Sequence, residues 1–134
     1  MKTLNIILMA GLLSFLFGCK AQTKSPETTF QSVSVGQFEQ IIADTFHVVR
    51  LDVRSPQEYA VGHIPSAINI DVLQDDFEPK ALSILPKDKT IALYCRSGRR
   101  SKKAAEILSK HQYKVVELDA GFNGWTAQGK TTEE

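Results

Sequence analysis

Residues 90–108 read TIALYCRSGRRSKKAAEIL, and this segment decides the fold. Its first five residues are apolar or β-branched, as in a buried strand. From residue 101 to 112, apolar residues recur at helical spacing among lysines, which predicts an amphipathic helix. Cys95 and five loop residues lie between the two. A buried strand that leads through a short loop into a helix is the repeating unit of parallel sheets, so the segment predicts an α/β fold.

Segments of the same two kinds alternate along the rest of the chain. Ser55 and Glu58 form a capping box that starts a short helix at Pro56, and Ser34 is a candidate N-cap for another helix. We expect strands at 47–52, 67–70 and 114–118, and helices at 35–43, 77–85 and 121–128. These segments predict a three-layer sandwich, a central mostly parallel sheet with helices on both faces, over residues 33–130.

Ligands of such sheets bind beyond the carboxyl ends of the strands. Polar residues stand at four of these ends: Asp52, Asp71, Cys95 and Asp119. Only Cys95 is a nucleophile.

The composition is that of one small domain. The chain has 134 residues, of which 43% are apolar and 23% charged, with a formal net charge of +1 and two cysteines. Two cysteines cannot build a disulfide scaffold, and the near-zero charge argues against nucleic acid as a partner. No internal repeat is present, and we expect a monomer.

The N-terminus has the features of an export signal. Lys2 precedes an apolar run at residues 4–17, which is shorter than the roughly 20 residues that span a bilayer. The run ends in Leu16-Phe17-Gly18-Cys19, which resembles a bacterial lipobox. We expect residues 1–18 to be a lipoprotein signal peptide and residues 19–32 to be a lipidated Cys19 with a flexible tether. An uncleaved N-terminal anchor is the alternative.

A lipid on Cys19 would attach the exported protein to a bacterial membrane. Lys20 stands where an aspartate would favour retention at the inner membrane in many Gram-negative bacteria. We therefore expect the protein at the outer membrane, facing the periplasm or the cell surface.

The loop after the central strand concentrates groups that activate a thiol. Ser97 and Gly98 are small, so the loop can curl with its amides inward, and the following helix directs its N-terminus at Cys95. Both features favour the reactive thiolate. Five cations and no acid lie within this stretch, which predicts an anionic ligand; they are Arg96, Arg99, Arg100, Lys102 and Lys103. A buried structural cysteine beside a solvated basic helix is the alternative.

Five short motifs together resemble a single-domain rhodanese, a sulfurtransferase. They are Asp52-Val53-Arg54, Glu58-Tyr59, Gly62-His63-Ile64-Pro65-Ser66-Ala67, Cys95-Arg96-Ser97-Gly98-Arg99-Arg100-Ser101 and Gly121-Phe122-Asn123-Gly124-Trp125. Ser66 stands where glycine is more usual, and Asn123-Gly124 fits the family's paired glycines loosely. Each motif is weak alone, but their order and spacing are specific.

The resemblance implies a rhodanese-like fold and a two-step sulfur transfer without cofactor or metal. Cys95 takes the outer sulfur of a small anionic donor such as thiosulfate, and the resulting persulfide passes it to a thiol or to cyanide. The loop residues that would bind the donor are Arg96, Ser97, Gly98, Arg99, Arg100 and Ser101. With Cys19 lipidated, no second cysteine remains to resolve an oxidised Cys95, so the acceptor must be external.

Two other functions stay open. Related phosphatases and arsenate reductases carry a longer loop with arginine six residues after the cysteine, where this chain has Ser101, so the loop favours sulfur over phosphate. A non-catalytic protein-binding module is the second alternative, although such a module needs neither Cys95 nor the arginines.

Three residues outside the loop are expected to be structural. We expect Arg54 to form an ion pair with Glu58 four residues later. His63 is expected to be packed and hydrogen-bonded, and Trp125 to anchor the core.

Overall fold

The computed structural model describes residues 29–134. The expected signal peptide, Cys19 and most of the tether lie outside the described residues. Five strands form one sheet in the order β1-β5-β4-β2-β3, and every neighbouring pair is parallel. The strands are β1 (Gln31–Val33), β2 (Val48–Asp52), β3 (Ile68–Asn69), β4 (Thr90–Tyr94) and β5 (Val115–Leu118).

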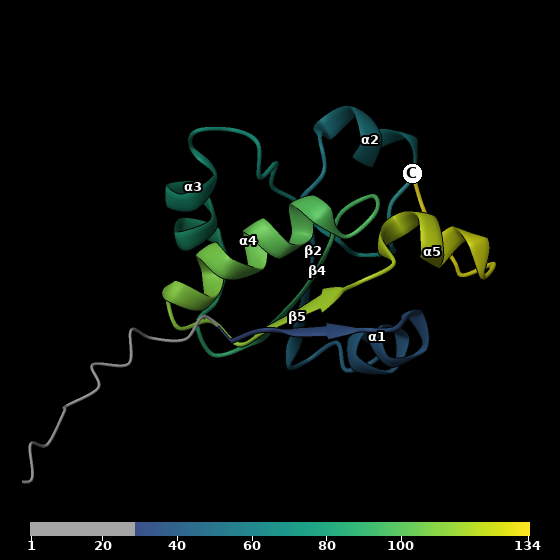
Figure 1. Cartoon of the computed structure of the whole chain (residues 1–134), viewed down its shortest axis with the longest axis horizontal. Helices are drawn as coiled ribbons and strands as arrows, with labels where there is room; N and C mark the ends of the chain where they lie inside the picture. Colours follow the sequence, from purple (N-terminus) through teal and green to yellow (C-terminus); the bar gives the residue numbers. More distant parts are fainter. Residues whose placement is uncertain (1–28) are drawn as a thin grey trace, which may run out of the picture.

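Helices cover both faces of this sheet, as the sequence predicted (Figure 1). They are α1 (Val35–Ile42), α2 (Pro56–Val61), α3 (Phe77–Ile84), α4 (Arg99–Lys110) and α5 (Gly121–Ala127). Buried residues of α3 and α4 pack on one face, and buried residues of α1 and α5 pack on the other. In Figure 1, α4 lies above the sheet and α1 below it. The three-layer sandwich is therefore confirmed.

The central strand β4 contributes to both cores. Ile91 and Leu93 face the core beneath α3 and α4, whereas Ala92 and Tyr94 face the core beneath α1 and α5. Because successive side chains of a strand point to opposite faces, a strand covered on both faces is apolar throughout.

Capping residues in the sequence determine where α1 and α2 begin. The Ser34 hydroxyl accepts from the backbone N–H of Gln37 at 3.3 Å, and that of Ser55 accepts from Glu58 at 3.2 Å, both within capping boxes.

Packing confirms two further predictions. Trp125 is buried in the core, and His63 is buried with its Nδ1 atom 2.9 Å from the carbonyl oxygen of Tyr59.

The structure corrects three boundaries. The sequence predicts that residues 31 and 32 belong to the tether, but they form part of β1. This short, exposed edge strand has no apolar pattern and pairs with β5. The domain also extends past residue 130, because Glu133 exchanges two main-chain hydrogen bonds with His63. Helix α4 begins at Arg99 and not at residue 101, since Gly98 already serves as its N-cap.

Ser66 occupies a backbone conformation that favours glycine. Its φ angle is +63°, in the left-handed region that side chains rarely adopt. This explains why glycine is the more usual residue at the corresponding place of the motif.

Within residues 29–134, no helix is both long enough and apolar enough to cross a membrane.

Candidate active site

Cys95 lies directly after β4, where the chain turns into α4. Its Sγ atom accepts a hydrogen bond from the backbone N–H of Gly98 at 3.1 Å and lies 3.3 Å from the Ser101 hydroxyl oxygen. Burial raises the pKa of the thiol, but hydrogen bonds from Ser101 and from the backbone N–H groups of Ser97 and Gly98 lower this pKa by more. The net effect is a Cys95 pKa below its ordinary value, which favours the thiolate.

Two glycines let the loop close around this sulfur. Gly98 has a φ angle of +95°, and a Cβ atom there would overlap the carbonyl oxygen of Asp119. Gly121 has a φ angle of +63°, and a Cβ atom there would overlap the carbonyl group of Arg96. The loop also receives backbone hydrogen bonds from α5, since Phe122 N–H donates to Cys95 at 2.8 Å and Asn123 N–H to Arg96 at 3.0 Å. The start of α5 thus holds the Cys95 loop in place through these two backbone hydrogen bonds.

Beneath the thiol, a hydrogen-bonded chain leads to a buried carboxylate. The Ser101 hydroxyl donates to Oε1 of Glu117 at 2.7 Å, and Glu117 is fully buried in β5. The Ser32 hydroxyl donates to Oε2 of the same carboxylate at 2.6 Å, and Lys102 Nζ donates to Oε1 at 3.2 Å. Three donors therefore compensate the burial of this charge, as a buried carboxylate requires.

The cations of the loop are less isolated than the sequence suggested. The side chain of Arg100 forms two hydrogen bonds with the carboxylate of Glu58, at 2.7 and 2.9 Å. Lys102 pairs with both Glu117 and Asp119. Residues 95–103 contain no acid, but acids from α2, from β5 and from the loop after β5 pair with two of the cations. Part of the positive charge that predicted an anionic ligand is therefore already compensated. Among residues 29–134, Arg96, Arg99 and Lys103 have no acidic partner within ion-pair distance.

The expected ion pair between Arg54 and Glu58 is absent from the part of the chain that the structure describes, and this prediction is wrong. Arg54 pairs instead with the buried Asp52, whose Oδ2 atom accepts from Nη2 at 2.7 Å and from the Tyr94 hydroxyl at 2.8 Å. The reason is that Arg54 turns back onto the end of its own strand, whereas Glu58 faces Arg100.

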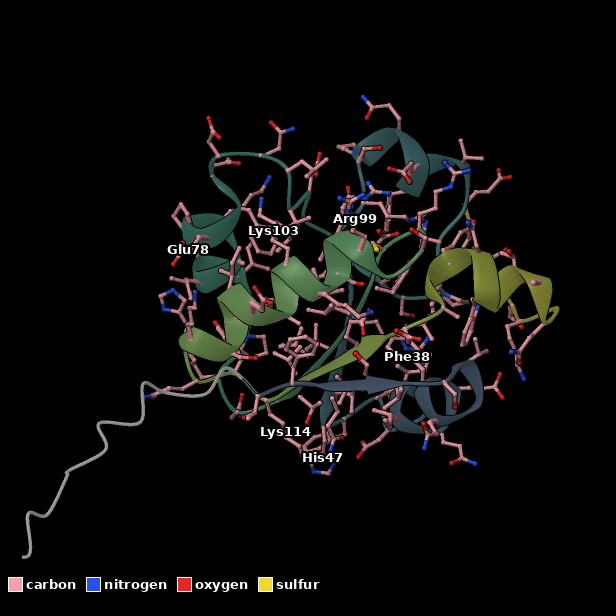
Figure 2. All side chains as sticks on the ribbon, viewed as in Figure 1. Phe38, His47, Glu78, Arg99, Lys103 and Lys114 are labelled. Carbon is pink, nitrogen blue, oxygen red and sulfur yellow. The ribbon has the colours of Figure 1, made fainter. Side chains whose placement is uncertain are left out.

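The predicted site residues gather around one turn of chain but differ in exposure. Gly98 and Ser101 are buried, Arg100 is half-buried, and Arg96, Ser97 and Arg99 are exposed. Figure 2 shows Arg99 at the start of α4, with Lys103 further along the same helix. Cys95 itself is only 1% exposed.

Sequence reasoning missed Glu58 and Glu117 as neighbours of the loop. Glu117 carried a usable signal, because it is an acid between the apolar residues Val116 and Leu118 of a predicted buried strand, where a charge needs a partner. Glu58 carried none beyond its capping box. No group of three or more histidine, cysteine or acidic side chains suited to a metal ion occurs within residues 29–134.

Comparison with known proteins agrees with the strand, loop and helix arrangement. The sequence profile of the rhodanese-like domain matches residues 34–128. The chain belongs to the rhodanese-like family. This match spans all five motifs, including the Cys95 loop.

Relatives within the rhodanese-like family include named sulfurtransferases. The chain is 37% identical over 91 residues to a sulfurtransferase from Allochromatium vinosum, an alignment that covers 67% of this chain and 82% of the relative. It is 32% identical over 124 residues to the thiosulfate:glutathione sulfurtransferase of Saccharomyces cerevisiae, which covers 84% of this chain and 88% of that protein. Each alignment covers most of both proteins.

A solved structure shares the fold. The rhodanese-related protein from Thermoplasma volcanium superposes with a TM-score of 0.68 at 29% identity, over 78% of this chain and 98% of that one. The α/β architecture described above is thus that of the rhodanese-like family.

Proposed function

We propose that this protein is a sulfurtransferase that carries sulfane sulfur as a persulfide on Cys95. The observation that carries the proposal is the Cys95 loop, which curls around the sulfur and directs the Gly98 N–H at it. Such a cradle favours a sulfur anion, either the attacking thiolate or the terminal sulfur of a persulfide. The sulfurtransferase relatives support the same chemistry.

The first step moves one sulfur atom from the donor to the enzyme. The Cys95 thiolate attacks the outer sulfur of thiosulfate, or of a persulfide donor, and a new S–S bond forms. With thiosulfate, the old S–S bond breaks and sulfite leaves with its electron pair, which leaves Cys95 as a persulfide anion. Covalent catalysis of this kind divides one difficult transfer into two easier steps.

The second step returns Cys95 to its starting state. A thiolate or cyanide attacks the outer sulfur of the persulfide, and the bond to Sγ breaks with its electron pair kept on Sγ. Each step transfers a sulfur atom from one anion to another, with no electrons gained from or lost to an outside redox partner, so neither step requires a redox cofactor. Arg96, Arg99 and Arg100 of this loop supply positive charge for the anionic donor, although the charge of Arg100 is partly compensated by Glu58.

Intact mass spectrometry tests the proposal. Incubation of the soluble domain with thiosulfate should add about 32 Da, the mass of one sulfur atom, and a thiol or cyanide should remove it. Cys95→Ser should show no adduct while retaining the fold by circular dichroism. Hydrolysis of an aryl phosphate faster than sulfur transfer would instead support the phosphatase alternative.

One observation favours a second candidate, a non-catalytic binding module. Cys95 is 1% exposed, and a module that only recognises a partner protein needs no access to it. Absence of a thiosulfate adduct, together with an unchanged phenotype of Cys95→Ser in the cell, would support this candidate.

We further propose that the protein is exported and anchored by a lipid on Cys19. The lipobox-like sequence at residues 16–19 supports this proposal. Labelling with a radioactive fatty acid should mark the full chain and not Cys19→Ser. Equal labelling of both proteins would contradict it.

A further inference from the structure

A groove of about 540 Å³ lies beside the Cys95 loop, among side chains from α2, α5 and the loop itself. Arg96, the residue after Cys95, forms part of its wall, together with Val61 of α2 and Phe122 of α5. The backbone N–H of Phe122 donates to the carbonyl oxygen of Cys95 at 2.8 Å. The groove therefore borders the loop directly, and a ligand in it would contact Arg96, the residue after the reactive cysteine.

A buried cation contributes to the groove. Arg54 is 3% exposed, and its Nε and Nη2 atoms are held by Asp52 and by the carbonyl oxygen of Gly62. Its guanidinium plane lies over the ring of Phe122, with Cζ 4.2 Å from the ring centre. The Nη1 atom has no hydrogen-bond partner among the described residues and is not sealed from solvent. The structure thus holds Arg54 rigid with one donor free.

The net charge of the groove is positive. Asp52 compensates Arg54, and Arg100 compensates Glu58, the acid in the groove wall. Arg96 has no acidic partner within ion-pair distance among residues 29–134 and is exposed. A free Nη1 donor on Arg54 and an unpaired guanidinium on Arg96, both in the wall of this groove, suit a carboxylate, which accepts planar N–H pairs.

We propose that this groove binds the acceptor in the second step, and that the acceptor is a small thiol that carries a carboxylate. Arg96 and Nη1 of Arg54 would bind the carboxylate, while the exposed side chain of Val61 and the ring of Phe122 contact the carbon chain. The acceptor thiol loses its proton to solvent, and its thiolate attacks the outer sulfur of the Cys95 persulfide. The bond between that sulfur and Sγ breaks, and Sγ keeps the electron pair. The inference rests on the proposed sulfur transfer.

A charge introduced at Val61 tests the groove without disturbing the core. Val61 is 79% exposed, so Val61→Glu and Val61→Lys should both fold. Cys95 is first loaded with sulfur from thiosulfate, and excess donor is removed. The rate of persulfide loss is then measured with 3-mercaptopropionate and with 2-mercaptoethanol, two thiols that differ in the carboxylate.

The readout is the rate constant for 3-mercaptopropionate divided by that for 2-mercaptoethanol. Because both thiols attack as thiolates, this ratio isolates the effect of the carboxylate. We expect Val61→Glu to lower the ratio and Val61→Lys to raise it, with a difference of about fivefold at low salt that shrinks at high salt. Leu73→Glu is the matched control, since Leu73 is 59% exposed but does not line the groove. Leu73→Glu should leave the ratio unchanged.

The outcomes separate this inference from the proposed function. If persulfide forms but the ratio is the same in both Val61 variants, or if Leu73→Glu shifts it equally, the groove does not bind the acceptor. If thiosulfate leaves no persulfide, the proposed function fails at its first step, and the inference falls with it.

Discussion

The hydroxyl group of Ser101 lies between Cys95 and Glu117, donating to the buried Glu117 carboxylate at 2.7 Å while its oxygen lies 3.3 Å from the Cys95 sulfur. A hydroxyl has one proton, so Ser101 cannot donate to both groups at once. In the thiol state Cys95 donates to Ser101, and in the thiolate state the Ser101 proton must turn toward the sulfur. Glu117 therefore competes with the thiolate for that proton.

Replacing Glu117 with glutamine should lower the pKa of Cys95 further. The neutral amide is a weaker acceptor for Ser101 than the carboxylate, and the substitution removes a negative charge beneath the sulfur. The thiolate absorbance near 240 nm, followed against pH, reports this pKa. The rate of persulfide formation should shift to lower pH by the same amount.

The control for this substitution is Glu106→Gln, which removes an exposed acid from α4, the helix that carries Ser101. It should leave the Cys95 titration unchanged. A rise in the Cys95 pKa in Glu117→Gln would contradict the expectation and would mean that Glu117 receives the thiol proton through Ser101.

Glu58 should make the stability of the domain depend on acid pH. The hydrogen bonds from Arg100 lower the pKa of Glu58 from 4.5 to about 2. Because the folded-state pKa is lowered, the stabilisation is present above pH 4.5 and is lost as the pH falls toward 2. Urea unfolding of Glu58→Gln at several pH values should show a smaller fall over this range than the unmodified protein.

The glutamine at position 58 preserves the cap of α2, since its side-chain oxygen still accepts from Ser55. A fall of equal size in the two proteins would show that other carboxylates account for the acid sensitivity.

The same substitution should increase reaction with thiosulfate. Glu58 holds Arg100 through two hydrogen bonds, so its neutralisation frees a cation at the mouth of the loop and removes a negative charge. We expect kcat/KM for thiosulfate to rise about two- to fivefold at low salt, an effect that should decline as salt screens the charges. An unchanged or lower kcat/KM would mean that the ion pair itself positions the loop for the donor.

The fold followed from local patterns in the sequence. The apolar β4, the capping boxes at Ser34 and Ser55 and the amphipathic α4 are each encoded within a few neighbouring residues. The edge strand β1 was missed because its three residues have no apolar alternation, and only its pairing with β5 defines it.

The site followed from the sequence only where its residues are neighbours in the chain. Cys95, Gly98 and Ser101 lie within one short stretch that runs from the loop into the first turn of α4, and their spacing already indicated that they meet. The acids that compensate the cations come from distant segments: Glu58 lies 42 residues from Arg100. Ser32 reaches Glu117 across 85 residues. No local pattern specifies such pairs, because they depend on the order of the strands in the sheet.

Gly98 should tolerate no side chain, whereas Gly129 should tolerate one at moderate cost. Both have a left-handed backbone, with φ angles of +95° and +68°. A Cβ atom at Gly98 would overlap the backbone of Asp119, but at Gly129 it would meet nothing within 4 Å. We expect Gly129→Ala to reduce the free energy of unfolding by about 1 kcal/mol through backbone strain alone.

Gly98→Ala adds the overlap with Asp119 to the same strain, so it should reduce the free energy of unfolding by about 3 kcal/mol or more. It should also slow persulfide formation, because relief of the overlap moves the Gly98 N–H away from the Cys95 sulfur. Urea unfolding and the mass-shift rate measure the two effects. The expectation would be contradicted if the two variants lost equal stability and Gly98→Ala formed persulfide normally. The loop would then adapt to a side chain at residue 98, and its close approach to Asp119 would not determine the position of the Gly98 N–H beside the Cys95 sulfur.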